Sequence, residues 1–425
     1  MNKMLYPNCE RLDFSIDNIE SAVNRSGNQF VGNFTGLQLT TAFQPIYSVA
    51  HRRPVGHEAL LRAFSPLGPV APQVVFDTIQ AESEAIFLDR LCRNLHLRNF
   101  LSMADDTSWL FLNINPQVVV NGKRYGAYFA DLLARYDFPA HRIVVEIVER
   151  AIGDETMLAE AVGYYKDLGC LVAIDDFGAG HSNFDRIWRI RPNIVKIDRT
   201  IIVQAAASRR ISRIMPNLVS LIHESGSLAL IEGVETEDEA LIALDSGIDF
   251  VQGYYFARPE NRLAPADQAN QTMIHLCAKF HEYSEKEVAN YHRELDGYID
   301  IFQEAARQIA VGIEPHLACA VILSQTKTER CFVLDQNGKQ LGANIVSSAN
   351  LIKNDPRFRP VAKSEGAMWA RRHYFRRAIS QPGQVQVTRP YLSVARANMC
   401  ITLSIAIQAG DDPMVLCCDL DWADA

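Results

Sequence analysis

Between residues 40 and 257, short apolar runs rich in β-branched residues alternate with longer stretches of helical periodicity. The clearest runs cover residues 109–113, 143–146, 171–176, 194–196, 228–232 and 250–252. Continuous apolar strands that alternate with helices are typical of a parallel sheet covered on both faces. About eight such units in roughly 220 residues predict an α/β fold, a TIM-type (β/α)8 barrel rather than an open sheet.

Each of these apolar runs ends in polar side chains, which are Asn113, Glu146, Asp175, Asp176, Lys196, Glu232 and Gln252. In a barrel the C-terminal ends of the strands meet at one mouth, where active sites are built. So many acidic and amide groups at one mouth would repel each other unless cations lay among them. A strand-end carboxylate or a helix N-cap explains any single member, but the whole set predicts a cation site.

Glu58 begins the segment Glu-Ala-Leu-Leu-Arg, which follows Phe-Gln-Pro-Ile-Tyr at residues 43–47. Further motifs follow in order: Leu-Asn-Ile-Asn at 112–115, Glu-Ile-Val-Glu at 146–149, Asp-Asp-Phe-Gly-Ala-Gly at 175–180, Lys-Ile-Asp at 196–198, Glu-Gly-Val-Glu at 232–235 and Gln-Gly-Tyr-Tyr-Phe-Ala-Arg-Pro at 252–259. From about residue 36 to residue 260 the chain resembles the EAL domain of bacterial cyclic di-GMP phosphodiesterases. The resemblance implies hydrolysis of cyclic di-GMP to linear pGpG.

The resemblance also implies a site for two divalent cations, Mg²⁺ or Mn²⁺. One cation would be held by Glu58, Asn113, Glu146 and Asp175, and the second by Asp175, Asp176 and Glu232. Oxygen ligands without Cys or His suit these hard ions. Lys196 would orient or help to deprotonate the attacking water, and whether Glu232 is a ligand or a general base stays open. Excess Ca²⁺ is expected to inhibit, because a larger ion disturbs the geometry of a two-metal site.

Other residues match family positions that contact the substrate or control a loop. The substrate-binding set is Gln44, Leu60, Arg62, Asp198, Gln252 and Arg258, with Arg62 in a charge-assisted contact to phosphate. Glu149 and Glu235 would control the glycine-containing loop at 176–183, which couples homodimer formation to activity in the family. The alternative for this loop is a plain tight turn without a regulatory role. A receptor that binds cyclic di-GMP without turnover is the main alternative function, and a Schiff-base aldolase using Lys196 is disfavoured by the surrounding carboxylates.

The organisation changes after residue 259. Residues 284–312 predict one helix that begins at a capping box of Ser284 and Glu287, with a heptad seam of Val288, Tyr291, Leu295, Tyr298, Phe302, Ala305 and Ile309. Such a seam is typical of a dimeric coiled coil or of a helix packed on its own domain, and both remain open. We therefore expect an N-terminal lead (1–30), an EAL barrel (31–262), a helical linker (263–314) and a C-terminal domain (315–425).

Residues 315–425 predict an α+β domain, with a hairpin whose Asn337-Gly338 pair suits a type I′ turn. The segments 369–377 and 389–393 are similar to PAS/Cache-like sensor modules. The resemblance implies a pocket for an unknown small ligand, lined by Trp369, Arg372, Tyr374, Arg389, Tyr391 and Asp419. The alternative is a packing and dimerisation domain without a ligand.

Charge and cysteine usage limit the partners and the compartment. The net charge is -8, and no Lys or Arg block forms a basic stripe, which disfavours nucleic acid and anionic membranes as partners. The nine cysteines form no C-x-x-C pair, as expected in a reducing cytoplasm. No apolar run approaches the roughly 20 residues of a transmembrane helix. A soluble, cytoplasmic protein is expected.

Overall fold

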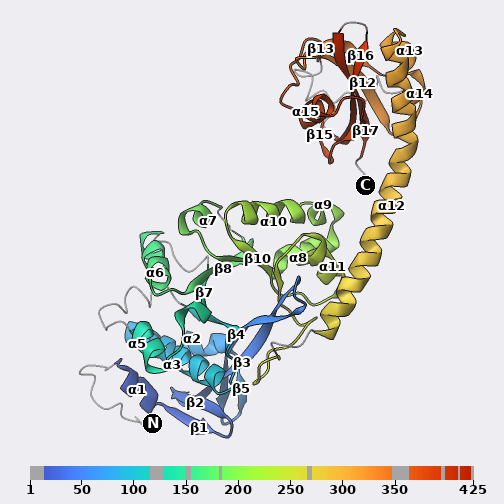
Figure 1. Ribbon diagram of the computed structural model, residues 1–425. Helices are drawn as coiled ribbons and strands as arrows, with labels where there is room; N and C mark the ends of the chain where they lie inside the picture. Colours follow the sequence, from blue (N-terminus) through green and yellow to red (C-terminus); the bar gives the residue numbers. More distant parts are fainter. Residues whose placement is uncertain are drawn as a thin grey trace. The chain divides into compact units, whose positions relative to one another are not determined.

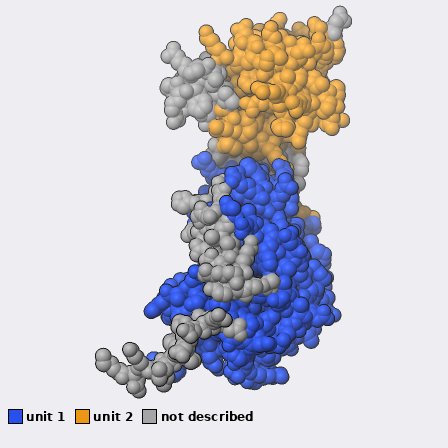
Figure 2. Space-filling view, turned by 90° about the vertical axis from the view of Figure 1, so that its left-hand side faces the viewer, with its two compact units in different colours: residues 1–282 blue, residues 283–425 orange. Residues whose placement is uncertain are grey.

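The computed structural model describes residues 14–114, 128–148, 155–180, 184–265, 270–346, 363–393, 398–409 and 412–422. The chain divides into two compact units, Met1–Glu282 and Tyr283–Ala425 (Figure 2). Each unit has its own sheet. In the described part of the chain, every helix is too short or too polar to cross a membrane.

The first unit is built on a closed barrel of eight strands (Figure 1), which confirms the predicted fold class. In barrel order the strands are β3 (Leu37–Ser48), β4 (Arg53–Ser65), β6 (Trp109–Ile114), β7 (Ile143–Val148), β8 (Leu171–Phe177), β9 (Ile194–Ile197), β10 (Leu228–Ile231) and β11 (Phe250–Val251). The strands β1 (Val23–Ser26) and β2 (Gln29–Phe34) extend the sheet beside β3, and β5 (Gly68–Val70) pairs with β4.

Strand β3 is antiparallel to both of its barrel neighbours, β4 and β11. The six other adjacent pairs in the barrel are parallel. At this strand the sheet differs from the parallel sheet that the alternating pattern predicts. The reason is local, because only residues 49–52 separate β3 from β4, and parallel neighbours need a crossover of a dozen or more residues.

Helices between the strands cover the outside of the barrel (Figure 1). They are α3 (Glu82–Leu101), α5 (Tyr128–Arg135), α6 (Glu155–Asp167), α7 (Phe184–Ile190), α8 (Arg199–Ala207), α10 (Met215–Glu224) and α11 (Glu237–Asp245), with the shorter α1 (Ile16–Ser21), α2 (Pro72–Asp77), α9 (Arg209–Ser212) and a 3-10 turn at Ala140–Arg142. Outward strand residues such as Val145, Val172 and Val195 are buried in the cluster that contains these helices. Packing of apolar helix faces on the sheet thus stabilises the barrel.

A layer of apolar side chains fills the barrel interior below its mouth. Seven strands contribute one buried residue each: Ile46, Phe111, Val144, Ala173, Ile194, Leu230 and Phe250. The eighth strand contributes Gly56, where an added Cβ would lie 2.6 Å from the Phe111 ring. Side chains return to the same face of a strand every two residues. The next inward position of each strand is therefore the set Gln44, Glu58, Asn113, Glu146, Asp175, Lys196, Glu232 and Gln252.

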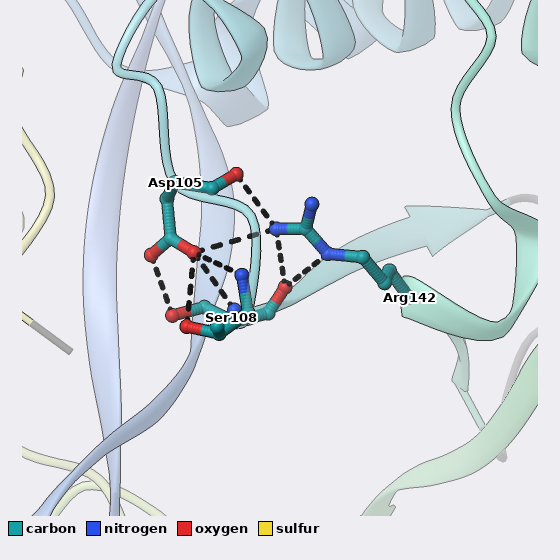
Figure 3. Close-up of polar contacts among 4 residues, drawn as sticks. Asp105, Ser108 and Arg142 are labelled. Atoms are coloured by element: carbon teal, nitrogen blue, oxygen red, sulfur yellow. Dashed lines mark hydrogen bonds and ion pairs between the residues drawn. The ribbon is translucent and has the colours of Figure 1, made fainter. Parts of the chain in front are cut away.

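A polar cluster connects the segments that lead into β6 and β7 (Figure 3). The Arg142 guanidinium donates to the carbonyl oxygens of Asp105, at 2.8 Å, and Ser108, at 3.0 Å. The Asp105 carboxylate accepts from the backbone N–H of Thr107 and Ser108, both at 2.8 Å. Although burial alone would raise the pKa of Asp105, the hydrogen bonds from Ser108 and Thr107 lower it. This cluster satisfies the backbone groups at the end of the barrel opposite the mouth.

The second unit contains an antiparallel sheet in the order β13 (Gln340–Ile345), β12 (Thr328–Asp335), β17 (Asp412–Asp421), β16 (Met399–Ala409) and β14 (Gln386–Val387), with β15 (Tyr391–Leu392) also on β16. The helix α12 (Gln271–Ala310) precedes it, followed by α13 (Pro315–Ala318) and α14 (Ala320–Leu323), while α15 (His373–Ser380) lies between β13 and β14 in sequence. Apolar residues of α12, α13 and α14 pack with β12, β16 and β17, and those of α15 pack in a separate cluster.

Two local predictions for this part of the chain are wrong. The helix begins at Gln271, so Ser284 lies within it and forms no capping box. The hairpin between β12 and β13 is confirmed, but its turn is not type I′, since Gly338 has φ +81° while Asn337 is not among the residues with positive φ. Instead, the Asp335 carboxylate accepts from the backbone N–H of Asn337 at 2.8 Å and of Lys339 at 2.9 Å.

The predicted heptad seam of α12 packs within its own unit over its C-terminal half. Leu295, Phe302, Ala305 and Ile309 are buried with residues of β12, β16 and β17. The side chains of Val288 and Tyr291 lie outside the described residues. From Leu295 onward, therefore, the seam belongs to a domain core, which is the second of the two readings that the sequence left open.

Candidate active site

Lys196 lies at the centre of four carboxylates in the barrel mouth. Its side chain is 1% exposed, and its Nζ is 2.8 Å from Glu146 Oε1, 2.8 Å from Asp175 Oδ1, 3.2 Å from Glu232 Oε2 and 3.9 Å from Glu58 Oε2. These residues come from five different strands, β4, β7, β8, β9 and the end of β10. The structure thus brings together the charged strand-end residues that the sequence singled out.

Glu58 is held by two amides, that of Asn113 on the adjacent strand β6 and that of Gln252 directly after β11. The Asn113 side chain donates to Glu58 Oε1 at 2.8 Å, and the Gln252 side chain donates to Oε2 at 2.7 Å. All three side chains occupy the inward position directly above the apolar layer. The amide hydrogen bonds fix the orientation of the Glu58 carboxylate in the mouth.

Lys196 contributes one ammonium group, whereas four carboxyl groups lie within 4 Å of it. Burial alone would raise the pKa of Glu58, but Lys196 and the hydrogen bonds from Gln252 and Asn113 lower it. Burial, together with the charge of Glu58, raises the pKa of Glu146 well above its ordinary value. Burial likewise raises the pKa of Glu232 to about 8, even with Lys196 nearby. Lys196 alone is therefore insufficient to hold all four carboxyl groups in their ionised form.

Lys196 itself is held in its charged form. Burial would lower its pKa, but the charges of Asp175, Glu146, Glu232 and Glu58 outweigh burial and raise the pKa well above its ordinary value. Schiff-base chemistry needs an unprotonated amine with a lowered pKa. The aldolase alternative is therefore disfavoured by the geometry as well as by the sequence.

Asp175 and Asp176 are consecutive, and a regular strand would direct them to opposite faces. The backbone of Asp176 has φ +58°, and the pairing of β8 with β9 shifts register between Ile174 and Phe177. This irregularity breaks the alternation. As a result, carboxylate oxygens of Asp175, Asp176 and Glu232 lie within 4.8 Å of one another.

The donor set of the mouth fits a divalent cation. It consists of carboxylate and amide oxygens, the ligands that Mg²⁺ and Mn²⁺ prefer. Gln252 Oε1 is buried and has no hydrogen-bond partner among the described residues. This oxygen, and the raised pKa values of Glu146 and Glu232, are what a site that requires additional positive charge would show.

The remaining predicted substrate residues lie in four segments of the chain. Gln44 on β3 is the direct cross-strand neighbour of Glu58, whereas Leu60 and Arg62 follow Glu58 on β4 at two-residue intervals and are half-buried. The Asp198 carboxylate caps α8 by accepting from Thr200 N at 3.0 Å. The Arg258 guanidinium is exposed and lies 4.4 Å from the centroid of the Tyr254 ring.

Of the two predicted loop-control residues, Glu149 lies outside the described residues. Glu235 forms a two-point ion pair with Arg199, whose Nη1 and Nη2 are each 2.6 Å from a Glu235 oxygen. Arg199 was not singled out from the sequence. Its position directly after the Lys-Ile-Asp motif was the available signal, but the pairing joins two segments that are distant in sequence.

The predicted pocket residues of the second unit are partly assembled. The rings of Tyr374 and Tyr391 are stacked at 6.5 Å, and the Arg372 guanidinium lies 5.9 Å from the Trp369 ring and 6.0 Å from the Tyr391 ring. The Trp369 Nε1–H donates to Gln340 at 3.0 Å. Arg389 is exposed.

Asp419 is fully buried and already bonded within the sheet. Arg330 Nε donates to its Oδ2 and Thr402 Oγ1 donates to its Oδ1, both at 2.7 Å. Both partners are cross-strand neighbours of Asp419. Arg330 and Thr402 could not be predicted from the sequence, because only the strand register shows that they face this carboxylate.

Comparison with known proteins agrees with this geometry. Residues 29–259, more than half of the chain, match the family model described as the EAL domain. YkuI of Bacillus subtilis, an uncharacterized EAL-domain containing protein, is 24% identical over 394 residues, which are 90% of this chain and 94% of YkuI. RocR of Pseudomonas aeruginosa, a cyclic di-GMP phosphodiesterase, is 26% identical over 221 residues, which are 51% of this chain and 56% of RocR.

A crystal structure of Bacillus subtilis YkuI in complex with the substrate c-di-GMP and calcium shares the fold of this chain. The TM-score is 0.77 at 23% sequence identity, and the match covers 91% of this chain and 96% of YkuI. The chain spans nearly all of YkuI but only about half the length of RocR.

Proposed function

The chain belongs to the EAL-domain family, and on this premise we propose that it is a cyclic-guanylate-specific phosphodiesterase that hydrolyses cyclic di-GMP to linear pGpG with Mg²⁺ or Mn²⁺. The observation that carries the proposal is the ring of oxygen donors around Lys196, in which every family ligand position retains an oxygen donor. The name of RocR, a cyclic di-GMP phosphodiesterase, supports the same substrate.

The residues of the mouth would have two roles, to hold the cations and to orient the attacking water. Glu58, Asn113, Glu146 and Asp175 would hold one cation, and Asp175, Asp176 and Glu232 a second. Bound divalent cations polarise phosphoryl oxygens and lower the pKa of water. Lys196, held as an ammonium, would orient the attacking water and offset the negative charge that develops on phosphorus.

Substrate would be positioned by the residues that surround this ring. Arg62 would contact a phosphate through charge-assisted hydrogen bonds. Gln44, Leu60, Asp198, Gln252 and Arg258 complete the proposed substrate-binding set. Glu235 and Glu149 would control the loop that follows Asp176.

For residues 315–425 we propose a PAS/Cache-like sensor domain that regulates the phosphodiesterase, and we propose that the protein acts as a cytoplasmic homodimer. The aromatic and Arg372 side chains that meet around Tyr391 support a small-ligand site there. Asp419 would act indirectly, since Arg330 and Thr402 already occupy its oxygens.

The deciding experiment measures conversion of cyclic di-GMP to pGpG by the purified full chain with Mg²⁺ or Mn²⁺. We expect turnover with either ion, inhibition by excess Ca²⁺, and a loss of at least about a hundredfold in Glu58→Gln, which removes the charge but keeps the shape. Glu260→Gln is the matched control, because Glu260 is about half exposed and paired with Arg262 outside the ring. Tight binding of cyclic di-GMP without product, over concentrations that permit dimers, would show a receptor instead.

A further inference from the structure

The helix α8 begins directly after the strand that carries Lys196. The Asp198 carboxylate caps the helix by accepting from the backbone N–H of Thr200 at 3.0 Å. Only Ile197 and Asp198 separate Lys196 from the first residue of α8. The first turn of α8 is therefore fixed relative to Lys196.

The loop that follows Asp175 and Asp176 rests on this first turn. Gly178 has φ +99°, and a Cβ added there would lie 2.1 Å from Ile201 Cδ1. In addition, the backbone N–H of Asp198 donates to the carbonyl of Phe177 at 3.0 Å. A side chain at residue 178 would displace either the loop or Ile201, so close contact here requires glycine.

The loop that follows Glu232 rests on the same turn from the other direction. Gly233 has φ +68°, and its added Cβ would lie 2.6 Å from Arg199 Cβ and 2.8 Å from Cγ. The Arg199 guanidinium then binds both oxygens of Glu235 at 2.6 Å. Arg199 therefore contacts this loop with its aliphatic stem and its charged end at once.

We propose that Arg199 and Ile201 are positioning residues that set the separation between the Asp175–Asp176 pair and Glu232. Each side chain supports one of the two loops, and both belong to one helical turn anchored to the Lys196 strand. A change in that turn alters the spacing of the cation-binding carboxylates without removing any of them. The kinetic part of this inference rests on the proposed function, whereas its cation-binding part stands on the geometry alone.

The size of the effect separates positioning from simple stabilisation. The Arg199 and Glu235 side chains are 47% and 35% exposed, and exposed ion pairs contribute only about 0–1 kcal/mol to stability. Removal of groups that orient metal ligands, by contrast, typically costs about 10–100-fold in metal affinity or activity. A large loss of cation affinity with little loss of stability is thus specific to positioning.

The test measures Mn²⁺ affinity of the full chain by titration calorimetry, together with kcat and KM for cyclic di-GMP. We expect Arg199→Ala to weaken Mn²⁺ binding about 10-fold and lower kcat similarly, with KM nearly unchanged. Arg199→Lys keeps an aliphatic stem and the positive charge, so its Mn²⁺ affinity and kcat should lie between those of Arg199→Ala and the wild type. Ile201→Ala should also weaken Mn²⁺ binding and lower kcat, because it removes the side chain that contacts the loop at Gly178.

Arg135→Ala is the matched control, since Arg135 is 49% exposed and pairs with Asp17 and Glu20 outside the barrel mouth. Wild-type Mn²⁺ affinity in both Arg199→Ala and Ile201→Ala would overturn the proposal, as would an equal loss in Arg135→Ala. If the wild type binds Mn²⁺ but produces no pGpG, the proposed function fails, and the Mn²⁺ affinities of the variants alone decide this inference.

Discussion

Asp176 shows how much one backbone angle decides at the scale of the residue. A non-glycine residue in the left-handed region costs roughly 1–2 kcal/mol, and Asp176 adopts φ +58°. The result is that two consecutive carboxylates face the same mouth. Backbone strain of this kind clusters at functional sites, where the surrounding structure maintains it. His96, on the outer side of the barrel, illustrates a different residue-scale effect, the burial of a titratable ring.

We expect His96 to make the folding stability fall in acid. Burial lowers the pKa of His96 to about 4, compared with 6.5 for an exposed ring, and its Nδ1 lies 2.8 Å from Thr41 Oγ1. Because the unfolded chain binds the proton more readily, stability is complete above about pH 6.5 and is lost as the pH falls toward 4. The loss from this residue is on the order of 3 kcal/mol.

Urea denaturation of wild type and His96→Asn between pH 7 and pH 4.5 checks this expectation. The unfolding free energy of the variant should decrease less in acid than that of the wild type. Part of the decrease should remain, because burial also lowers the pKa of His57 to about 4. His275→Asn, at an exposed position of α12, is the control. Identical pH profiles for wild type and His96→Asn would contradict the assignment.

At the scale of the element, α12 combines two uses of glycine. Gly297 lies within the helix, is exposed, and has open space where a Cβ would be. Gly312 lies just beyond the helix with φ +94°, and the following N–H of Ile313 donates to the carbonyl of Gln308 at 3.0 Å. The first glycine weakens a helix interior, and the second ends the helix in a conformation that disfavours other residues.

Alanine at these two positions should therefore have opposite effects. Gly297→Ala is expected to raise the free energy of unfolding by about 1 kcal/mol, because alanine restricts the unfolded backbone and favours helix. Gly312→Ala is expected to lower it by about 1 kcal/mol, because the left-handed conformation strains alanine. Chemical denaturation of the two variants measures both changes, and equal signs would refute this account of the helix.

At the scale of the whole molecule, the chain contains two separate sets of apolar cores. Every apolar cluster among the described residues lies within a single unit. The clusters of the first unit include no residue beyond Phe280, and the clusters of the second unit include no residue before Leu295. Proteins with several domains often unfold in more than one step. The proposed cation site belongs entirely to the first unit.

Differential scanning calorimetry should accordingly resolve two unfolding transitions. Mn²⁺ should stabilise only the transition of the first unit, because the proposed cation site lies there. Mass action predicts about 2.7 kcal/mol at a free ligand concentration of 100 Kd. A single transition that moves as a whole on ligand addition would show that the two units unfold together.

The barrel and the membership of its mouth could be predicted from the sequence because their signals are local. Most strands of the barrel have a buried apolar residue in the interior and a polar residue two positions later at the mouth, so one short segment of sequence contains both. Phe111 with Asn113 and Leu230 with Glu232 are examples. The motif order then indicated the family. The predictions of a capping box at Ser284 and of a type I′ turn were wrong although their signals were also local. The helix continues upstream of Ser284 to Gln271, and the Asp335 carboxylate binds the backbone of the hairpin turn.

The tertiary structure alone decided which of these residues touch. The antiparallel β3, the register shift that turns Asp176 toward Glu232, the pairing of Arg330 with Asp419 and that of Arg199 with Glu235 all join segments brought together by folding. The spacing of apolar residues along the sequence indicates which face of a strand a side chain occupies. It does not indicate which other strand lies beside it. Strand register and backbone angles at loops depend on the packing of the whole barrel, and the candidate site depends on both.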